Sequence, residues 1–386
     1  MGSGQDNAIK YEDMKTKYAG FLYPCIKVEI GGKDLSAAKE GVVIYDLDAE
    51  LSSGFEASVV RFSVTEILDP KTHKYNADIM KNYLVLGASA AVNVGYGGKM
   101  EQIFLGFVSK VRFIHEDESP MHAEVTAMDI KGVMMSNAYA RQLTAKVYSE
   151  AVREIFSGPR YQKIQSAGIF NAQLNIEDTP DKKNSEGNKE TADTIEMVDE
   201  SDYEFVVKAA KKFNYEFFIK NGDVIFRKND SEKKVRLVLG AGKGIRNFDV
   251  SYDIVGLVEQ VEARGMNDGD GKLITATEKL TNKLWVGNTV KSLLADSKKV
   301  FFDPTIRDKD EASYRAKSVM HNISNRFGYM ECECDGIPEL LPGCLIRTEG
   351  LGAQVDNIFY ITGVRHSISD TSGYKTILTG TAASIS

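Results

Sequence analysis

Apolar and polar residues alternate most clearly near the C-terminus, in residues 327–380. Apolar side chains recur there at alternate positions (Ile358, Tyr360, Val364, Ile368), and prolines, glycines and an Asp-Thr-Ser-Gly turn interrupt the pattern. Alternation with a period of two is typical of a strand with one buried face, and Asp, Ser and Gly favour tight turns. The pattern predicts a β-meander of four short strands.

An upstream segment, residues 86–129, presents the same order of features. Gly87 matches Gly343, since each opens an apolar strand that ends in a glycine-rich turn. An inner glycine follows in the next strand, Gly106 in one segment and Gly363 in the other, and both segments then pass through an Asp/Ser turn into a strand that carries threonine. Chance similarity between two β-meanders is the alternative. We interpret the match as two copies of one small β-barrel.

The remaining N-terminal segments fit a first barrel of roughly six strands. Residues 24–32, 42–53 and 57–67 read as strands, and residues 67–83 read as a loop with a short helical piece. The polar stretch before them predicts an arm with one short helix.

Helical patterns occupy the middle of the chain. Val147, Ala151 and Ile155 lie at four-residue spacing, and Ser-Gly-Pro follows Phe156, so residues 139–156 predict a helix. The mostly acidic residues 176–200 contain few apolar side chains and predict an exposed loop, either a solvated insertion or a docking surface.

A helix followed by a hairpin is predicted directly after the acidic loop. Ser201 or Asp202 can cap a helix whose apolar stripe includes Phe205, and Asn221-Gly222 is a strong hairpin signal between two apolar runs. A further helix is predicted over residues 311–327. The fold class is therefore mainly β, with two similar small β-barrels in tandem and a helix-plus-hairpin α/β domain between them. The predicted division is an N-terminal arm (1–21), a first β-barrel (22–136), an α/β insertion domain (137–234) and a second β-barrel (235–386) with a helix at 309–326.

Composition indicates a globular protein of more than one domain. The chain has 386 residues, 42% hydrophobic and 27% charged, and a net charge of −7. That charge argues against nucleic-acid binding, which requires a basic surface. The N-terminus lacks the apolar core of a signal peptide, and no apolar run approaches the length of a membrane span, so we expect synthesis in the bacterial cytoplasm.

No motif for catalysis, cofactor binding or metal binding stands out. Cys332 and Cys334 share a strand face but lack the C-x-x-C spacing, so we expect them, with Cys25 and Cys344, to be free thiols packed in a core. Residues 240–244, GAGKG, lack the rest of a phosphate-loop motif, and residues 267–272, NDGDGK, lack a bidentate glutamate. Both predict turns between strands. The five histidines show no zinc-protease spacing; paired carboxylates remain open, because such pairs assemble in space.

Four segments resemble the hub proteins of contractile tails, namely the late control protein D family of phages and the hub portion of type VI secretion VgrG proteins. Residues 200–219 are similar to the family's acid-Ser-Asp-aromatic-x-Phe helix. The helix at 311–324 leads into residues 333–350, which resemble its Gly-x-Pro-x-Leu-x-Pro-Gly stretch, and residues 359–380 resemble its closing hairpin. The resemblance covers most of residues 23–381. It marks structural positions at Gly87, Gly106, Asp129, Ser201, Asp202, Phe205, Pro338, Pro342, Gly343, Gly363, His366, Gly373 and Tyr374.

The resemblance implies a non-enzymatic hub without cofactors. Three copies, each with two similar barrels, would form a pseudo-six-fold ring that joins a hexameric tail-tube protein to a trimeric spike and to other baseplate components. Family members that carry their own spike continue into an OB-fold and a β-helix, and this chain stops at Ser386, so we expect the spike to be a separate protein. A glutamine frequent in the family before the acid-Ser-Asp element is absent, with Ile195, Glu196 and Met197 in its place.

Two other function classes remain as alternatives. One is a tail-associated cell-wall hydrolase, and the other is a polymer-binding β-barrel module, because small barrels often bind polymers. The sequence does not distinguish a phage from a tailocin, an extracellular injection system or a type VI apparatus.

Overall fold

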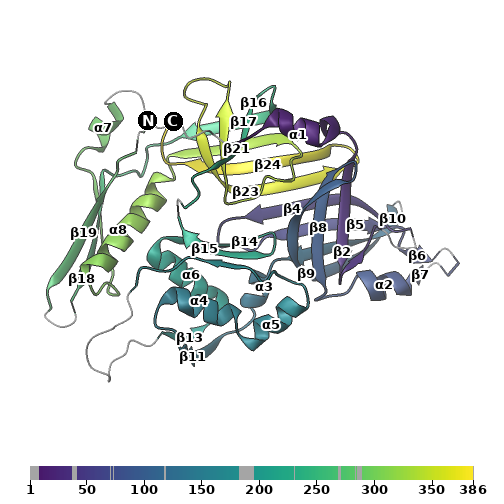
Figure 1. Ribbon diagram of the computed structural model, residues 1–386, viewed down its shortest axis with the longest axis horizontal. Helices are drawn as coiled ribbons and strands as arrows, with labels where there is room; N and C mark the ends of the chain where they lie inside the picture. Colours follow the sequence, from purple (N-terminus) through teal and green to yellow (C-terminus); the bar gives the residue numbers. More distant parts are fainter. Residues whose placement is uncertain are drawn as a thin grey trace.

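The protein has a mainly β fold, as the sequence predicts (Figure 1). The computed structural model describes residues 8–36, 41–69, 71–72, 74–116, 119–181, 195–229, 231–267, 271–282, 284 and 289–385. Part of the predicted arm, most of the acidic loop, His73 and the centre of the NDGDGK turn therefore lie outside the described residues.

One large sheet contains the strands of both predicted barrels. Its first unit has the spatial order β4-β5-β10-β9-β8-β2, and a short β3 extends it. The strands span Pro24–Ile30 (β2), Lys33–Asp34 (β3), Val43–Ser52 (β4), Val59–Thr65 (β5), Ser89–Tyr96 (β8), Lys99–Glu116 (β9) and Ser119–Met128 (β10). No pairing between β2 and β4 occurs in the part of the chain that the structure describes, so this unit is a curved open sheet there.

The second unit closes into a six-stranded barrel. Its strands follow the order β16-β17-β21-β24-β23-β22, and β22 pairs back with β16. They span Val235–Ala241 (β16), Gly244–Tyr252 (β17), Gly328–Asp335 (β21), Leu345–Glu349 (β22), Ile358–Ser369 (β23) and Gly373–Ala382 (β24). The four strands predicted in residues 327–380 are all present. Their predicted meander order is wrong, because β21 lies beside β24 and not beside β22.

The N-terminal arm packs on this barrel. Its predicted short helix is α1 (Tyr11–Lys17), which follows β1 (Ile9–Lys10) and precedes the 3-10 turn η1 (Ala19–Phe21). β1 pairs in parallel with β16. The buried residues of the arm and of both sheet units form one continuous hydrophobic core.

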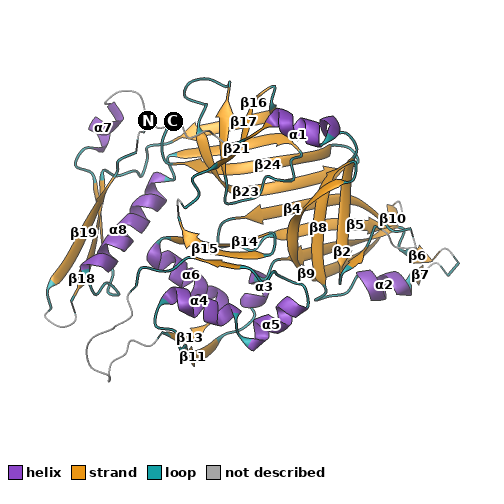
Figure 2. Cartoon of the chain, viewed as in Figure 1, coloured by secondary structure: helices purple, strands orange, loops and turns teal. Residues whose placement is uncertain are grey.

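The α/β insertion has a core of its own. The hairpin β14 (Tyr215–Lys220) and β15 (Asp223–Lys228) turns at Asn221-Gly222, as predicted, and lies between the large sheet and a layer of helices (Figure 2). These helices are α3 (Lys131–Met134), α4 (Tyr148–Phe156), α5 (Pro159–Ser166) and α6 (Asp202–Phe213). β12 (Leu174–Ile176) adds to the hairpin, and β11 (Tyr139–Gln142) pairs with β13 (Glu196–Glu200).

The helix predicted over residues 139–156 begins too early. Residues 139–142 form β11, and the helix α4 starts only at Tyr148. Residues 139–142 form backbone hydrogen bonds with β13. Between β11 and α4, the Glu154 carboxylate accepts the N–H groups of Thr144 and Ala145. Pairing with a strand distant in the sequence thus prevents the helix from extending back to residue 139, although the apolar spacing predicts it.

A third sheet lies apart from the barrels. β18 (Gln260–Met266) pairs with β19 (Leu273–Lys279) and β20 (Lys298–Phe302), and α8 (Lys309–Ser324) packs on it. Along the chain, the strands of this sheet and α7 (Thr289–Leu294) are inserted between β17 and β21. At the equivalent point of the first unit, only residues 53–58 separate β4 from β5. The strands that the sequence places in the second barrel at residues 260–279 therefore belong to an insertion. The small pair β6 (Leu68–Asp69) and β7 (Lys74–Tyr75) with α2 (Ala77–Tyr83) occupies the predicted loop between β5 and β8.

Candidate functional site

The two units meet in one seam, where β23 of the second unit pairs antiparallel with β4 of the first (Figure 1). The register runs from Gly363 opposite Ser52 to Ile368 opposite Leu47. One face of the seam is apolar and buried and includes Val364 and Leu51. On the other face, Arg365 donates two hydrogen bonds to the Asp48 carboxylate, at 2.7 and 2.6 Å. Burial on one face and an ion pair on the other fix the register.

The two units repeat each other strand by strand. In the first unit Val108 pairs with Ala127, a bulge follows, and Lys110 pairs with Thr126. In the second unit Ile361 pairs with Gly380, a bulge follows, and Gly363 pairs with Thr379. The bulge occupies the same place in both ladders, which equates β9 with β23 and β10 with β24.

The match extends to the next strands. Ala127 pairs with Val60 and Val60 with Ala49, while Gly380 pairs with Met330 and Met330 with Val250. A second pair of bulges also coincides, between Ile44 and Asp46 on β4 and between Ile245 and Asn247 on β17. β5 is therefore equivalent to β21, and β4 to β17.

Backbone hydrogen bonds confirm the sequence match between Gly87 and Gly343. Gly87 N–H donates to Val108 and Val108 N–H donates to Ala88, both at 2.9 Å. Gly343 N–H donates to Ile361 and Ile361 N–H donates to Cys344, also at 2.9 Å. Both glycines have a positive φ, 78° and 77°.

The match of the inner glycines is wrong. The common register equates Gly363 with Lys110, and it equates Gly106 with Phe359. Each glycine instead allows close approach of the neighbouring strand, β10 at Gly106 and β24 at Gly363. A Cβ on Gly106 would overlap the Met128 carbonyl, and a Cβ on Gly363 would overlap the Thr379 hydroxyl. The sixth strand also differs, because β2 is antiparallel to β8 whereas β16 is parallel to β22.

His366 and Tyr374 hold the connection between β21 and β22, which contains Pro338 and Pro342. His366 Nε2 lies 3.0 Å from the Leu340 carbonyl oxygen, and the Tyr374 hydroxyl lies 2.9 Å from His366 Nδ1. Burial lowers the pKa of His366 to about 4, so the ring is neutral near pH 7. A neutral ring that donates to Leu340 through Nε2–H accepts the Tyr374 O–H at Nδ1. Gly373, at the β23–β24 turn, has a φ of 67°.

Asp129 and Lys131 hold the loop between β4 and β5. The buried Asp129 carboxylate accepts the N–H groups of Ser58 at 2.8 Å and Lys131 at 2.9 Å. Lys131 Nζ, also buried, donates to the carbonyl oxygens of Gly54 and Glu56 at 2.8 Å each. Burial raises the pKa of Asp129 and lowers that of Lys131, and their mutual attraction opposes both shifts.

Ser201, Asp202 and Phe205 lie together at the start of α6. Ser201 is the N-cap: its hydroxyl accepts the Glu204 N–H at 3.1 Å, and Glu204 accepts the Ser201 N–H in return. Asp202 is fully buried and accepts the Tyr161 hydroxyl at 2.8 Å. These contacts join α6 to α5 within the insertion. The polar predicted residues thus lie in three separate places: Asp129 in the first unit, His366 and Tyr374 in the second unit, and Ser201 and Asp202 in the insertion.

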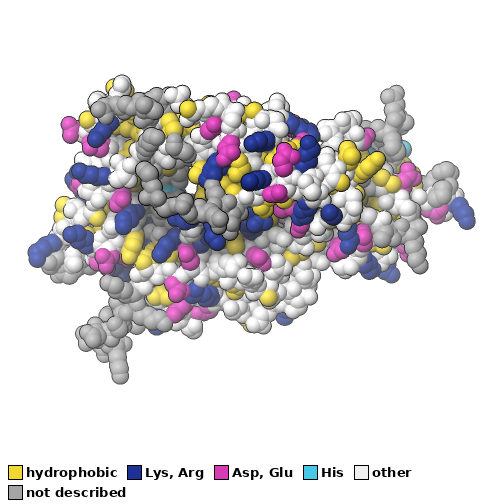
Figure 3. All heavy atoms as spheres, turned by 45° about the horizontal axis from the view of Figure 1, so that its top comes forward, with side chains coloured by type: hydrophobic (Ala, Val, Ile, Leu, Met, Phe, Trp, Pro, Cys, Tyr) yellow, Lys and Arg dark blue, Asp and Glu magenta, His cyan; other side chains and the backbone are white. Residues whose placement is uncertain are grey.

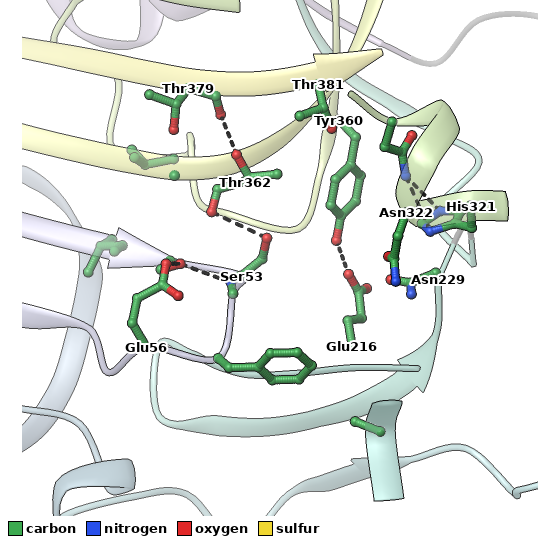
Figure 4. Close-up of a pocket in the computed structure, with 18 of the residues that line it drawn as sticks. Ser53, Glu56, Glu216, Asn229, His321, Asn322, Tyr360, Thr362, Thr379 and Thr381 are labelled. Atoms are coloured by element: carbon green, nitrogen blue, oxygen red, sulfur yellow. Dashed lines mark hydrogen bonds between the residues drawn. The ribbon is translucent and has the colours of Figure 1, made fainter. Parts of the chain in front are cut away.

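A cavity of about 770 Å³ lies beside the seam (Figure 4). Ser53 and Glu56 border it after β4, Thr362 and Thr379 border it from the barrel, and His321 borders it from α8.

Glu216, on β14, lies across the cavity from β23. Tyr360 points across the cavity and donates its hydroxyl to the Glu216 carboxylate, and Arg227 donates to the same group. Burial raises the pKa of Glu216, although Arg227 opposes the shift. Glu216, the most buried carboxylate that lines this cavity, is therefore hydrogen-bonded by Tyr360 and Arg227 of its own chain.

The described part of the chain contains no group of three His, Cys, Asp or Glu side chains placed to hold a metal ion, and none of its helices could cross a membrane. Cys332, Cys334 and Cys344 are buried free thiols, as predicted, and Cys25 is half-buried. Burial raises the pKa of Cys332 to about 12 and that of Cys344 to about 11. On the face shown in Figure 3, basic and acidic side chains are interspersed.

Sequence comparison identifies one family. The family model described as the Alg8 N-terminal domain matches residues 57–370, which include strands of both units and the whole insertion. The chain belongs to this family. The description names a domain and states no activity. No curated protein matches the sequence.

Solved structures share the fold over nearly the whole chain. The 43 kDa tail protein of prophage MuSo2 from Shewanella oneidensis has 13% identity and a TM-score of 0.65, and the match covers 93% of this chain and 98% of that one. A tail protein of Neisseria meningitidis has 12% identity and a TM-score of 0.65, with 94% and 97% covered. An Escherichia coli component of the type VI secretion system, described as similar to the T4 tail proteins gp27 and gp5, has 12% identity and a TM-score of 0.55, with 92% and 76% covered. At these identities the similarity establishes a shared fold.

The ion pair that crosses the seam, Arg365 with Asp48, is not among the residues that sequence reasoning selects. Aligning the two repeats through their bulges, and not through their glycines, equates Arg365 with Arg112 and Asp48 with Asp249. An arginine and an aspartate thus recur at equivalent positions of the two repeats, and the match through the glycines does not align them.

Proposed function

We propose that this chain is a structural protein of the baseplate or tail tip of a contractile injection apparatus. Three copies would form a ring of six similar β units that joins a six-fold tail tube to a three-fold spike. The protein would be made in the cytoplasm and assembled into a tail-like particle.

The observation that carries this proposal is the register-level duplication. The two units share the order of their strands and the positions of two bulges. A subunit with two nearly equivalent units can present six equivalent surfaces from three copies, which is what a junction between six-fold and three-fold symmetry requires. A protein with one active or binding site would not need two β units whose bulges lie at the same positions.

The shared fold supports the same proposal. The Shewanella and Neisseria proteins are described as tail proteins, and the Escherichia coli protein as a component of the type VI secretion system. Fold similarity alone does not determine function, so the duplication and the seam carry the argument.

A non-enzymatic role fits the way the buried ionisable groups are used. Asp129 and Lys131 hold a loop, His366 holds a connection, and Glu216 accepts from Tyr360 and Arg227. Each of these groups has a structural partner within the chain.

The experiment that tests the proposal is native mass measurement of the purified protein over a range of concentrations, alone and co-expressed with a candidate spike. Electron-microscopy class averages of the oligomer accompany it. We expect a three-copy ring with a central hole and six similar lobes. A protein that stays monomeric at every concentration, with and without the spike candidate, contradicts the proposal. Lysis of purified peptidoglycan by the protein would instead favour the cell-wall hydrolase.

A further inference from the structure

Two strand edges of the large sheet have no partner within the residues that the structure describes. β9 pairs with β8 only up to Phe107, so from Ser109 onward its outer edge is open. β17 pairs with β16 only at Gly244 and Ile245, so its outer edge is open from Arg246 to Tyr252. Open strand edges are sites at which another chain can pair.

These two open edges are the counterparts of the two edges that meet in the seam. The register equates β9 with β23 and β17 with β4. The seam between β23 and β4 joins the second unit to the first within one chain. Repetition of the same contact therefore requires β9 of one chain and β17 of another.

The side chains at the open edges complement each other as those of the seam do. Arg112 is equivalent to Arg365, and Asp249 is equivalent to Asp48, so an Arg–Asp pair would form at the same place. On the same face, Lys110 would lie opposite Asp253 of the partner subunit, where the seam has Gly363 opposite Ser52. Opposite charges across paired strands are favourable.

The other face is apolar in both cases. Phe113 is equivalent to His366, and it is 40% exposed. It would lie opposite Val250 of the partner subunit, as His366 lies opposite Ala49. Phe113 contacts Tyr75, with ring centroids 5.0 Å apart, and His366 contacts Leu340; both Tyr75 and Leu340 lie in equivalent connections, between β5 and β8 and between β21 and β22.

The charged groups at both edges are available. Arg112 pairs at 3.2 Å with Glu124, and both side chains are about half exposed, so this contact is weak. Asp249 is exposed, and none of the side-chain hydrogen bonds or ion pairs within the described residues involves its carboxylate.

We propose that β9 of one copy pairs antiparallel with β17 of a second copy, with Arg112 opposite Ser251 of the partner subunit and bonded to Asp249 of the partner subunit. Each copy has one edge of each kind, so the contact is heterologous, and it forms a ring when its rotation closes after three copies. The inference rests on the proposed function for the number of copies: three chains give three seams within chains and three between them. All six contacts then share one register.

Disulfide cross-linking tests the register. In a Cys25→Ser background, which removes the half-buried thiol, the paired substitutions Arg112→Cys and Ser251→Cys place two thiols on facing positions. We expect disulfide-linked species of up to three chains. The matched control combines Arg112→Cys with Asn247→Cys, which lies four residues along the same strand, about 13 Å from Ser251 and beyond the reach of a disulfide. We expect no link in the control.

Single-cysteine proteins distinguish heterologous from self-paired contacts. A mixture of the Arg112→Cys and Ser251→Cys proteins should give only two-chain products, and neither protein alone should link. Cross-linking of the Arg112→Cys protein with itself would overturn the proposal.

Charge reversal tests the ion pair. Arg112→Glu and Asp249→Arg should each weaken association by about tenfold or more, because like charges then face each other, and the double variant should recover most of the loss. Lys163→Glu, on the exposed face of α5, makes the same change in net charge as Arg112→Glu and should leave association unchanged. Thermal unfolding of each variant verifies that the fold is intact.

The outcomes separate this inference from the proposed function. A wild-type three-copy ring that forms no link between positions 112 and 251 overturns the strand pairing and leaves the hub proposal standing. A wild-type protein that neither associates nor links, with or without a spike candidate, overturns both.

Discussion

Arg365 and Asp48 join the two β units through a bidentate contact. Arg365 Nε and Nη2 lie 2.7 and 2.6 Å from the two carboxylate oxygens of Asp48. The Asp48 hydrogen bond is the largest cause that raises the pKa of Arg365. The geometry fixes the relative position of β23 and β4, because planar groups with two parallel hydrogen bonds allow little sliding.

This ion pair should make a modest, measurable contribution to stability. The side chains are 51% and 27% exposed, so solvent screens the attraction. We expect a double-mutant cycle of Arg365→Ala and Asp48→Ala to give a coupling of about 0.5–1 kcal/mol in urea unfolding. The neighbouring pair Arg61 and Glu50 has a single contact at 3.0 Å and is more exposed, so its coupling should be smaller. Equal couplings would show that the bidentate geometry adds nothing.

The equivalent glycines Gly87 and Gly343 should differ in their tolerance of alanine. Both need a positive φ, so alanine at either position costs about 1–2 kcal/mol of strain. A Cβ on Gly87 meets no atom within 4 Å, whereas a Cβ on Gly343 overlaps the buried ring of Phe218. We therefore expect Gly343→Ala to cost about 1–3 kcal/mol more than Gly87→Ala in denaturant unfolding. Equal losses would mean that Phe218 can move aside.

Local signals predict the local elements of this fold well. The Ser201 cap, the Asn221-Gly222 hairpin and the helix α8 are all where the sequence places them, because each depends on residues a few positions apart. Turns and caps are determined by local backbone chemistry.

Non-local pairing accounts for what the sequence did not predict. Alternation shows that residues 328–335 form a strand but not that β24 is its neighbour, and it does not separate β18 and β19 from the barrel. The second unit has a long insertion between β17 and β21, where the first unit has only a short loop between β4 and β5. The equivalence of β4 with β17 and of β5 with β21 is therefore difficult to recognise in the sequence.

The equivalence of the seam strands follows from the ladders. Both units have their bulges at the same places, so the bulges do not shift one repeat against the other. The glycine match placed Gly106 against Gly363, whereas the common register equates Gly106 with Phe359, four residues away. The glycine match therefore did not equate Arg112 with Arg365, and the ladders were needed to equate Asp249 with Asp48.

The Ser201 cap should be worth about 1 kcal/mol. Its hydroxyl satisfies the Glu204 N–H at 3.1 Å at the start of α6, which is the main helix of the insertion core. Ser201→Ala leaves that donor without its partner, and we expect a loss of about 1 kcal/mol in the free energy of unfolding. Ser166→Ala removes an exposed hydroxyl that donates to Gln162 within α5, and it should change stability by only a few tenths of a kcal/mol. Equal effects would exclude a capping role.

His366 should make the stability of the protein depend on pH between about 6.5 and 4. Burial lowers the pKa of His366 to about 4, whereas an unfolded histidine titrates near 6.5. Between these values the unfolded chain binds a proton that the folded chain does not, so stability falls as the pH falls. A shift of this size corresponds to roughly 3 kcal/mol, present above pH 6.5 and lost by pH 4.

The variant His366→Phe isolates this effect, since the first unit has Phe113 at the equivalent position. Near pH 7.5 the variant should be less stable by about 1–3 kcal/mol, because Leu340 and Tyr374 lose their hydrogen-bond partner. As the pH falls to 4 the wild-type protein should lose roughly 3 kcal/mol relative to the variant, so that the difference reaches zero or reverses in sign. Asp129 and Glu216 have raised pKa values, which give the opposite slope, but they are common to both proteins and cancel in the difference. A difference that stays constant from pH 7.5 to 4 would show that His366 is protonated as readily in the folded protein as in the unfolded chain.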